Sequence, residues 1–190
     1  MKILYIGKLS DNSNCSLRMN ALKKLGYNVI GLDPFFYFLG STKSKIWHKI
    51  HYSTGYIFLQ KKVFGWFDKK IESIKFIPDI VWIDGGELIN SSILELLKKY
   101  TCPIILLNND DVTGKRDKLR FLILKKAIKY FDHCFVYRHI NIEEYKKLGA
   151  KKISLLNFSY DEVAHKRLDD IKNIPSLFLS DISFIGTYMR

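Results

Sequence analysis

Short apolar runs alternate with helix-like stretches along most of the chain. The runs are rich in β-branched and aromatic residues, as buried strands are, and six of them lie at residues 2–6, 28–32, 79–84, 103–107, 133–137 and 152–156. Between most of them, apolar side chains recur at the spacing of an amphipathic helix. Strands that return after roughly 20 to 30 residues, with helices between them, are typical of parallel sheets. The sequence therefore predicts an α/β fold, a Rossmann-like open parallel sheet of about six strands with helices on both faces.

The stretch 79–90 shows this repeating unit most clearly. A strand rich in branched side chains ends at Asp84, and a loop follows that carries Glu87. The next helix is expected to begin with a capping box formed by Ser92 and Glu95. In open parallel sheets, ligands bind at the loops that follow the strands. This loop also contains two glycines, Gly85 and Gly86, which allow a ligand to approach its backbone closely.

Further helices are predicted at residues 15–25, 93–100, 115–130 and 141–148. The first ends at Gly26 and the last at Gly149, since glycine readily adopts the left-handed conformation that ends many helices. Asn141 is expected to cap the last helix, with Glu144 in the reciprocal position.

A cluster of amide and carboxylate side chains follows the almost wholly apolar strand at 103–107. It comprises Asn108, Asn109, Asp110 and Asp111. The position after a buried strand is where sites are usually built in such sheets. A helix cap is the alternative, because short polar side chains also satisfy the first amides of a helix.

Residues 35–76 are the least regular part of the chain and carry many lysines and aromatic side chains. We expect two helical segments here, separated near Gly55 or Gly65. Either the aromatic side chains form core with the lysines facing water, or residues 43–76 form a basic amphipathic surface for an anionic membrane or an extended acceptor. His48 and His51 could share a helical face, but no third ligand is suitably spaced, so no metal site is expected.

The chain is strongly basic. Its 190 residues contain 31 lysines and arginines against 19 acidic residues, a formal net charge of +12. Such an excess attracts phosphate groups on nucleic acids, on anionic lipids or on a nucleotide-linked substrate. Lysines spread over solvated helix surfaces give the same total. The hydrophobic content of 47% is ordinary for a soluble protein, and the length suits one α/β domain.

Cysteine usage and hydropathy indicate the compartment. Three widely spaced cysteines without a CxxC motif support neither a disulfide framework nor a zinc site. No apolar run reaches the ~18 residues that a membrane span needs, and the apolar segment at the amino terminus is too short for a signal peptide. We therefore expect a cytoplasmic protein, at most associated with a membrane surface.

Two common functions of α/β domains fit the sequence poorly. A dinucleotide-binding fingerprint needs three glycines after the first strand, and only Gly7 is present. Asp33, after the second strand, is then better explained as a turn residue before Pro34. A phosphate-accepting receiver domain would use Asp84, but Lys8 stands where such a domain needs acidic residues.

Several motifs follow one another along the chain in a recognisable order. They are MKILYIG at 1–7 with Arg18 and ALKKLGY at 21–27, DIVWID at 79–84, NNDD at 108–111, YRH at 137–139 with EYKKLGA at 144–150, and DISFIGTY at 181–188. In this order they resemble the amino-terminal half of GT-B glycosyltransferases, and among these the CgeB-like (spore-maturation-protein-like) family. The likeness runs nearly end to end, and its most specific parts are Arg138-His139 with the following helix and the terminal motif.

The resemblance implies an enzyme in which two Rossmann-like halves face each other and transfer a sugar from a nucleotide-sugar donor to a glycan or other acceptor. It implies an acceptor-side domain at 1–165, a linker at 166–180 and, at 181–190, the first strand of a truncated donor-binding domain. The alternative for 181–190 is an added edge strand of the same sheet. This fragment alone is then expected to be inactive, with no cofactor, no catalytic metal and no nucleic-acid partner. The alternative is a basic module that binds nucleic acid or an anionic surface without catalysis.

On this interpretation the candidate site residues form two groups. An inverting enzyme needs a base for the acceptor hydroxyl, whereas a retaining enzyme needs none. The candidates for that base, by loop position, are Glu87, Asp110, Asp111 and His139. The donor diphosphate would meet helix N-termini and basic side chains. The candidate substrate-binding residues are Gly7, Asn14, Arg18, Gly85, Gly86, Asn109, Arg138 and Gly186.

Overall fold

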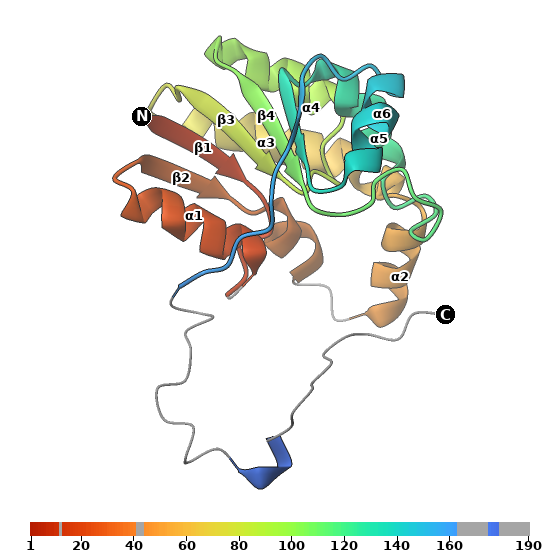
Figure 1. Cartoon of the computed structure of the whole chain (residues 1–190). Helices are drawn as coiled ribbons and strands as arrows, with labels where there is room; N and C mark the ends of the chain where they lie inside the picture. Colours follow the sequence, from red (N-terminus) through yellow and green to blue (C-terminus); the bar gives the residue numbers. More distant parts are fainter. Residues whose placement is uncertain (12, 41–43, 163–174, 179–190) are drawn as a thin grey trace. The chain divides into compact units, whose positions relative to one another are not determined.

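The structure, a computed structural model, describes residues 1–11, 13–40, 44–162 and 175–178 (Figure 1). Its centre is a six-stranded sheet in which all neighbouring strands are parallel, in the order β2-β1-β3-β4-β5-β6. The strands are β1 (Lys2–Ile6), β2 (Asn28–Leu32), β3 (Ile80–Asp84), β4 (Ile104–Asn108), β5 (His133–Val136) and β6 (Ile153–Leu155). The predicted Rossmann-like α/β fold is therefore confirmed.

Helices connect the strands and cover the sheet. They are α1 (Asn14–Lys24), α2 (Lys45–Ser53), α3 (Gln60–Ser73), α4 (Ser91–Leu97), α5 (Leu122–Ala127) and α6 (His139–Lys147). Shorter turns of helix are η1 (Phe36–Gly40), η2 (Ile57–Leu59), η3 (Lys98–Tyr100) and η4 (Ile128–Tyr130). In Figure 1, α1 lies in front of the sheet, whereas α3 and α4 lie behind it. Among the described residues, none of the helices combines the length and the apolar character that a membrane crossing requires.

The main hydrophobic core lies between the sheet and the helices behind it. Strand residues such as Leu4 and Ile83 are fully buried there against Phe67 of α3. Alternate strand residues point to the other face, where Tyr5 stacks on Trp82 with ring centroids 5.9 Å apart. Because both faces are buried, the central strands read as nearly continuous apolar runs.

The chain changes direction across the sheet between β1 and β3. β2 lies next to β1 on one edge, and the chain then returns past β1 to form β3 on the opposite edge of β1. In open parallel sheets, this arrangement opens a crevice at the carboxyl ends of the two strands. The loops after β1 and β3 therefore meet where a ligand is expected.

The lysine-rich tract after β2 is helical, as predicted, and its break falls at Gly55. α2 ends before this glycine, while Gly65 lies inside α3. Gly55 has a φ of +63°, and a Cβ at this position would collide with the backbone oxygen of Leu119. Glycine is therefore required here both by its backbone conformation and by the close approach of the loop before α5.

The helix predicted at 115–130 is shorter than expected, because α5 begins only at Leu122. The preceding residues form turns, and Lys118 adopts the left-handed backbone conformation with a φ of +47°. Arg120 instead reaches across to Glu87 of the loop after β3. Tertiary contacts of this kind override the helix propensity of a lysine-rich segment.

The capping box predicted for α4 is also wrong. The N-cap is Asn90, whose side chain accepts a hydrogen bond from the Ile93 amide at 2.9 Å. Ser92 lies within the first turn, and Glu95 pairs with Lys98 on the helix surface. Asn90 caps the helix because its backbone is extended and its short amide reaches the third amide of the turn.

The chain divides into two compact units, Met1–Ser159 and Tyr160–Arg190. The first contains all six strands and the pocket discussed below. In the second, the described residues are 160–162 and 175–178, which include the short turn η6 (Ser176–Phe178). Most of the predicted linker at 166–180 and all of the predicted strand at 181–190, with Gly186, lie outside the described residues.

Candidate functional site

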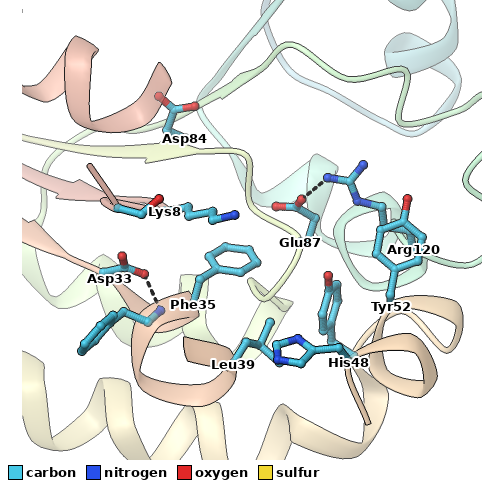
Figure 2. Close-up of a pocket in the computed structure, with 12 residues that line it drawn as sticks. Lys8, Asp33, Phe35, Leu39, His48, Tyr52, Asp84, Glu87 and Arg120 are labelled. Atoms are coloured by element: carbon cyan, nitrogen blue, oxygen red, sulfur yellow. Dashed lines mark hydrogen bonds and ion pairs between the residues drawn. The ribbon is translucent and has the colours of Figure 1, made fainter. Parts of the chain in front are cut away.

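A pocket of about 410 Å³ lies at the carboxyl edge of the sheet (Figure 2). Its apolar walls are formed by Phe35, Phe36, Leu39, Tyr52 and Tyr56, and its polar lining by Lys8, Ser10, Asp33, His48, Asp84, Glu87 and Arg120. These residues come from α2 and from the loops after the first four strands. The size and the apolar walls with a few polar groups are typical of small-molecule sites.

Asp84, at the end of β3, anchors one side of the pocket. Its side chain is 4% exposed and accepts hydrogen bonds from the Tyr5 hydroxyl and the Arg18 guanidinium. Burial and this carboxylate raise the pKa of the Cys15 thiol to about 12. In Figure 2 the carboxylate is directed away from Phe35 and the centre of the pocket. Arg18, a predicted substrate-binding residue, therefore holds α1 on the sheet and does not line the pocket.

Glu87 is the one of the four predicted catalytic residues that lines the pocket. Its Oε1 accepts a hydrogen bond from Arg120 at 2.6 Å, whereas Oε2 accepts none from the described residues. The Arg120 guanidinium also pairs with Asp110 at 3.0 Å and lies over the Tyr52 ring, 5.2 Å from its centroid. The carboxylate of Glu87 is thus fixed through one oxygen while the other remains available to a ligand.

The glycines of this loop make room for the protein's own side chains. Gly85 has a φ of +90°, and a Cβ there would approach Oε2 of Glu87 to 2.9 Å. Gly86 has a φ of +85°, and a Cβ there would approach methyl groups of Leu106 and Leu124 to 3.1 Å. Packing and backbone conformation therefore account for both glycines before any ligand is considered.

Tyr56 contributes a strained part of the pocket wall. It has a φ of +61°, which is uncommon outside glycine and costs roughly 1–3 kcal/mol. Its ring packs edge-on against Phe35, and burial together with the Glu87 carboxylate raises the pKa of its hydroxyl. Strained residues of this kind are concentrated at binding and active sites.

Asp33 also lines the pocket, but both of its oxygens are already used. Oδ2 accepts a hydrogen bond from the Leu9 amide at 2.7 Å and Oδ1 from the Phe36 amide at 2.8 Å. Asp33 was predicted to be a turn residue; in the structure it directly precedes the helical residues that begin at Pro34, and its side chain accepts from the amide of Phe36. These bonds leave the Asp33 carboxylate poorly placed to hold a ribose. Figure 2 shows Lys8 extending past Asp33 in the direction of Glu87.

A second acidic cluster lies beyond β4 and β5. Asp111 accepts a hydrogen bond from Asn141 at 3.2 Å and pairs with Arg138 at 3.1 Å. Asn141 is 2% exposed and also donates to Glu144 at 2.9 Å. The prediction that Asn141 caps its helix is therefore wrong, because α6 begins at His139. Instead, its side chain fastens the loop after β4 to α6.

The other predicted residues lie outside the pocket. Gly7 packs β1 against β3, since a Cβ there would lie 3.2 Å from the Cβ of Asp84. Asp110 is connected to the pocket through Arg120. Exposed side chains away from the pocket lining belong to Asn14, Asn109, Arg138 and His139.

Arg120, Tyr52 and Tyr56 are pocket residues that the sequence did not identify. A usable signal was the choice of arginine, because only six of the 31 basic residues are arginines. Each of the four arginines in the described part of the chain pairs with a carboxylate, as the planar guanidinium does best. The two tyrosines carried no comparable signal within an aromatic-rich tract.

The fold and the pocket define a Rossmann-like α/β protein with a candidate small-molecule site where the strand order reverses. No family model matches the sequence, and no curated protein matches it. Among solved structures, shikimate dehydrogenase from Thermotoga maritima is 14% identical over 80% of this chain and 86% of that chain, with a TM-score of 0.24. So distant a likeness carries no argument about function, and the fold rests on the strand order and register.

Proposed function

We propose that this chain is the acceptor-side domain of a nucleotide-sugar-dependent glycosyltransferase and that its pocket binds a sugar. The observation that carries the proposal is the environment of Glu87. Its carboxylate is nearly buried, is held by Arg120 through one oxygen, and lies in a pocket lined by aromatic rings. The order of motifs that resembles the GT-B amino-terminal half supports the same activity.

The chemistry of the lining favours a sugar over a wholly apolar or wholly charged ligand. A sugar ring has apolar C–H faces, which pack against rings such as those of Phe35 and Tyr56, and a rim of hydroxyls. Glu87 accepts hydrogen bonds from hydroxyl groups, and Lys8 donates them. Because Asp33 is engaged by backbone amides and a glycine fingerprint is absent after β1, a dinucleotide has less to bind here.

On this proposal Glu87 is the general base. In an inverting transfer, Oε2 takes the proton of an acceptor hydroxyl as that oxygen attacks the anomeric carbon of the donor. The bond from the anomeric carbon to the nucleoside diphosphate breaks, and the diphosphate leaves with the electron pair. Arg120 holds the carboxylate in one orientation during this step. In a retaining transfer, the same carboxylate only positions the acceptor hydroxyl.

Ligand-observed NMR with this 190-residue chain tests the proposal. Saturation transfer from the protein is expected for one or more members of a panel of monosaccharides, oligosaccharides and nucleotide sugars. Glu87→Gln keeps the shape of the side chain and the contact to Arg120, but removes the charged acceptor. We expect it to weaken sugar binding about tenfold, the loss typical of a hydrogen bond to a charged group.

Asp111→Asn is the matched control, since it makes the same change in the cluster outside the pocket and is expected to leave binding unchanged. The proposal is overturned if no saccharide receives saturation, if Glu87→Gln binds as tightly as the unmodified chain, or if NAD occupies the pocket and sugars do not.

A further inference from the structure

The segment from Phe35 to Phe67 lacks acidic residues altogether. It contains five lysines, two histidines and eleven of the chain's 27 aromatic residues. The segment forms η1, α2, η2 and the first half of α3. A stretch of this length with only one sign of charge favours an anionic partner.

Part of the apolar content of this segment faces solvent. Ile46 and Trp47 of α2 are 71% and 56% exposed, and Ile57 and Phe58 of η2 are 47% and 69% exposed. Figure 1 shows α2 at the edge of the molecule, away from the sheet. These side chains contribute little to the core, so their exposure needs another explanation.

Aromatic and basic groups are neighbours across α2 and the start of α3. The Trp47 ring stacks on His51 one turn later, with centroids 5.9 Å apart. Burial and the positive charges of His48 and Lys62 lower the pKa of His51. Lys61 and Lys62 are exposed and follow Phe58 by about one helical turn. We call Ile46, Trp47, Phe58, Lys61 and Lys62 the aromatic-basic surface.

We propose that the aromatic-basic surface binds an anionic phospholipid bilayer, with Trp47 and Phe58 inserted at the headgroup level and the two lysines contacting lipid phosphates. Exposed tryptophan, phenylalanine and isoleucine beside lysines are the composition of helices that lie in a membrane interface. Nucleic acid is the other polyanion that such a surface could attract. Aliphatic side chains such as Ile46 have no flat face on which bases stack, so the surface favours lipid.

Membrane docking through α2 has a consequence for the pocket. The same helix supplies His48 and Tyr52 to the pocket wall. A docked α2 would therefore hold the pocket within about one helix diameter, ~10 Å, of the lipid headgroups. This inference rests on exposed side chains and charge, and it stands whether or not the pocket binds a sugar.

Sedimentation with vesicles tests the surface directly. The 190-residue chain is mixed with vesicles of phosphatidylcholine alone and with vesicles that also contain phosphatidylglycerol. We expect binding to the anionic vesicles only, weakened by added salt. Trp47→Ala with Phe58→Ala, and separately Lys61→Glu with Lys62→Glu, are each expected to lower the partition coefficient at least about tenfold, since apolar insertion and lysine attraction contribute separately.

The chain offers matched controls on α1. Lys23→Glu with Lys24→Glu makes the same charge change at exposed positions, and Leu25→Ala truncates a side chain that is 71% exposed. Both controls are expected to bind anionic vesicles within about twofold of the unmodified chain. Absence of vesicle binding, equal losses in the controls, or unchanged binding after Trp47→Ala with Phe58→Ala overturns the proposal. Binding to duplex DNA without binding to vesicles also overturns it and assigns the surface to nucleic acid.

Discussion

The loops after β3 and β4 have similar sequences at their starts, but their acidic side chains lie in different environments. Each follows a buried strand and carries acidic side chains, Glu87 in the first and Asp111 in the second. Glu87 is fixed through one oxygen and lines a pocket. Asp111 is held by Asn141, Arg138 and the Gly114 amide.

This difference shows that distant partners decide what a carboxylate after a strand can do. The partners of Asp111 on α6 lie about 30 residues away, and they bind it into the scaffold. Among the described residues, Arg120, 33 residues away, is the hydrogen-bond donor to Glu87. Arg120 itself belongs to the far end of the loop after β4. In the loop after β4, Asp111 near the start therefore stabilises the scaffold, whereas Arg120 near the end contributes to the pocket by binding Glu87 of the loop after β3.

The largest effect on stability is expected at Asp84, where the loop after β3 begins. Asp84→Ala leaves the Arg18 guanidinium and the Tyr5 hydroxyl without their buried acceptor. We expect it to lower the free energy of unfolding by about 3 kcal/mol, because removing one partner of a buried pair strands the other. Urea unfolding followed by circular dichroism measures this change.

Asp111→Ala is the comparison for that variant. The Asp111 carboxylate is 29% exposed, so after the substitution water can hydrogen-bond to its former partners more easily than to those of Asp84. A loss of about 1 kcal/mol is expected. If Asp111→Ala destabilises the fold as much as Asp84→Ala does, burial does not distinguish the two loops.

A smaller loss of stability is expected from breaking the second cluster at its centre. Asn141→Ala removes donors to Asp111 and Glu144 from a site that is 2% exposed. We expect a loss of about 2 kcal/mol. Sugar binding is expected to stay unchanged, in contrast to Glu87→Gln. Loss of sugar binding in a folded Asn141→Ala protein would show that the two loops act as one site. Asn109→Ala, at an exposed position in the same loop, is the control and is expected to change stability by less than about 0.5 kcal/mol.

A pair of glycine variants separates packing from backbone strain in the loop after β3. Gly86 and Gly26 have nearly equal φ values, +85° and +83°. A Cβ on Gly86 meets Leu106 and Leu124, whereas one on Gly26 meets nothing within 4 Å. Gly86→Ala is therefore expected to destabilise the fold by about 1 kcal/mol more than Gly26→Ala. Equal losses would mean that strain alone keeps glycine in this loop.

The sequence predicted the sheet well because strand burial is a local signal. The six apolar runs and the helical tract after β2 could be recognised from short windows. The pocket could be recognised only in part. Glu87 followed a strand and a glycine pair, but its partner Arg120 lay within a segment that reads as helix.

Cooperation between distant segments explains the failures. The turns before α5 exist because Arg120 and the Leu119 backbone pack against the loop after β3 and against Gly55. No short window contains both sides of such a contact. The cap predicted at Asn141 failed for the same reason, since α6 begins at His139 and the Asn141 side-chain amide donates to the side chains of Asp111 and Glu144.

The smallest effect is expected at Asp117, near the end of the loop after β4, and it appears as a dependence on pH. A two-point hydrogen bond from Arg116, at 3.0 and 2.8 Å, lowers the pKa of Asp117 below its ordinary value. The folded state therefore gains stability from this carboxylate above the unfolded pKa of about 3.9 and loses it as the pH falls through the lower folded value. At neutral pH, the free energy of unfolding of the unmodified chain is expected to exceed that of Asp117→Asn by less than about 1 kcal/mol. The gap should close in acid, as measured by urea unfolding between neutral and acidic pH. Arg116→Gln is expected to lower the stability at neutral pH by a similar amount. Parallel stability curves for the unmodified chain and Asp117→Asn would show that the charge of the Asp117 carboxylate does not stabilise this end of the loop.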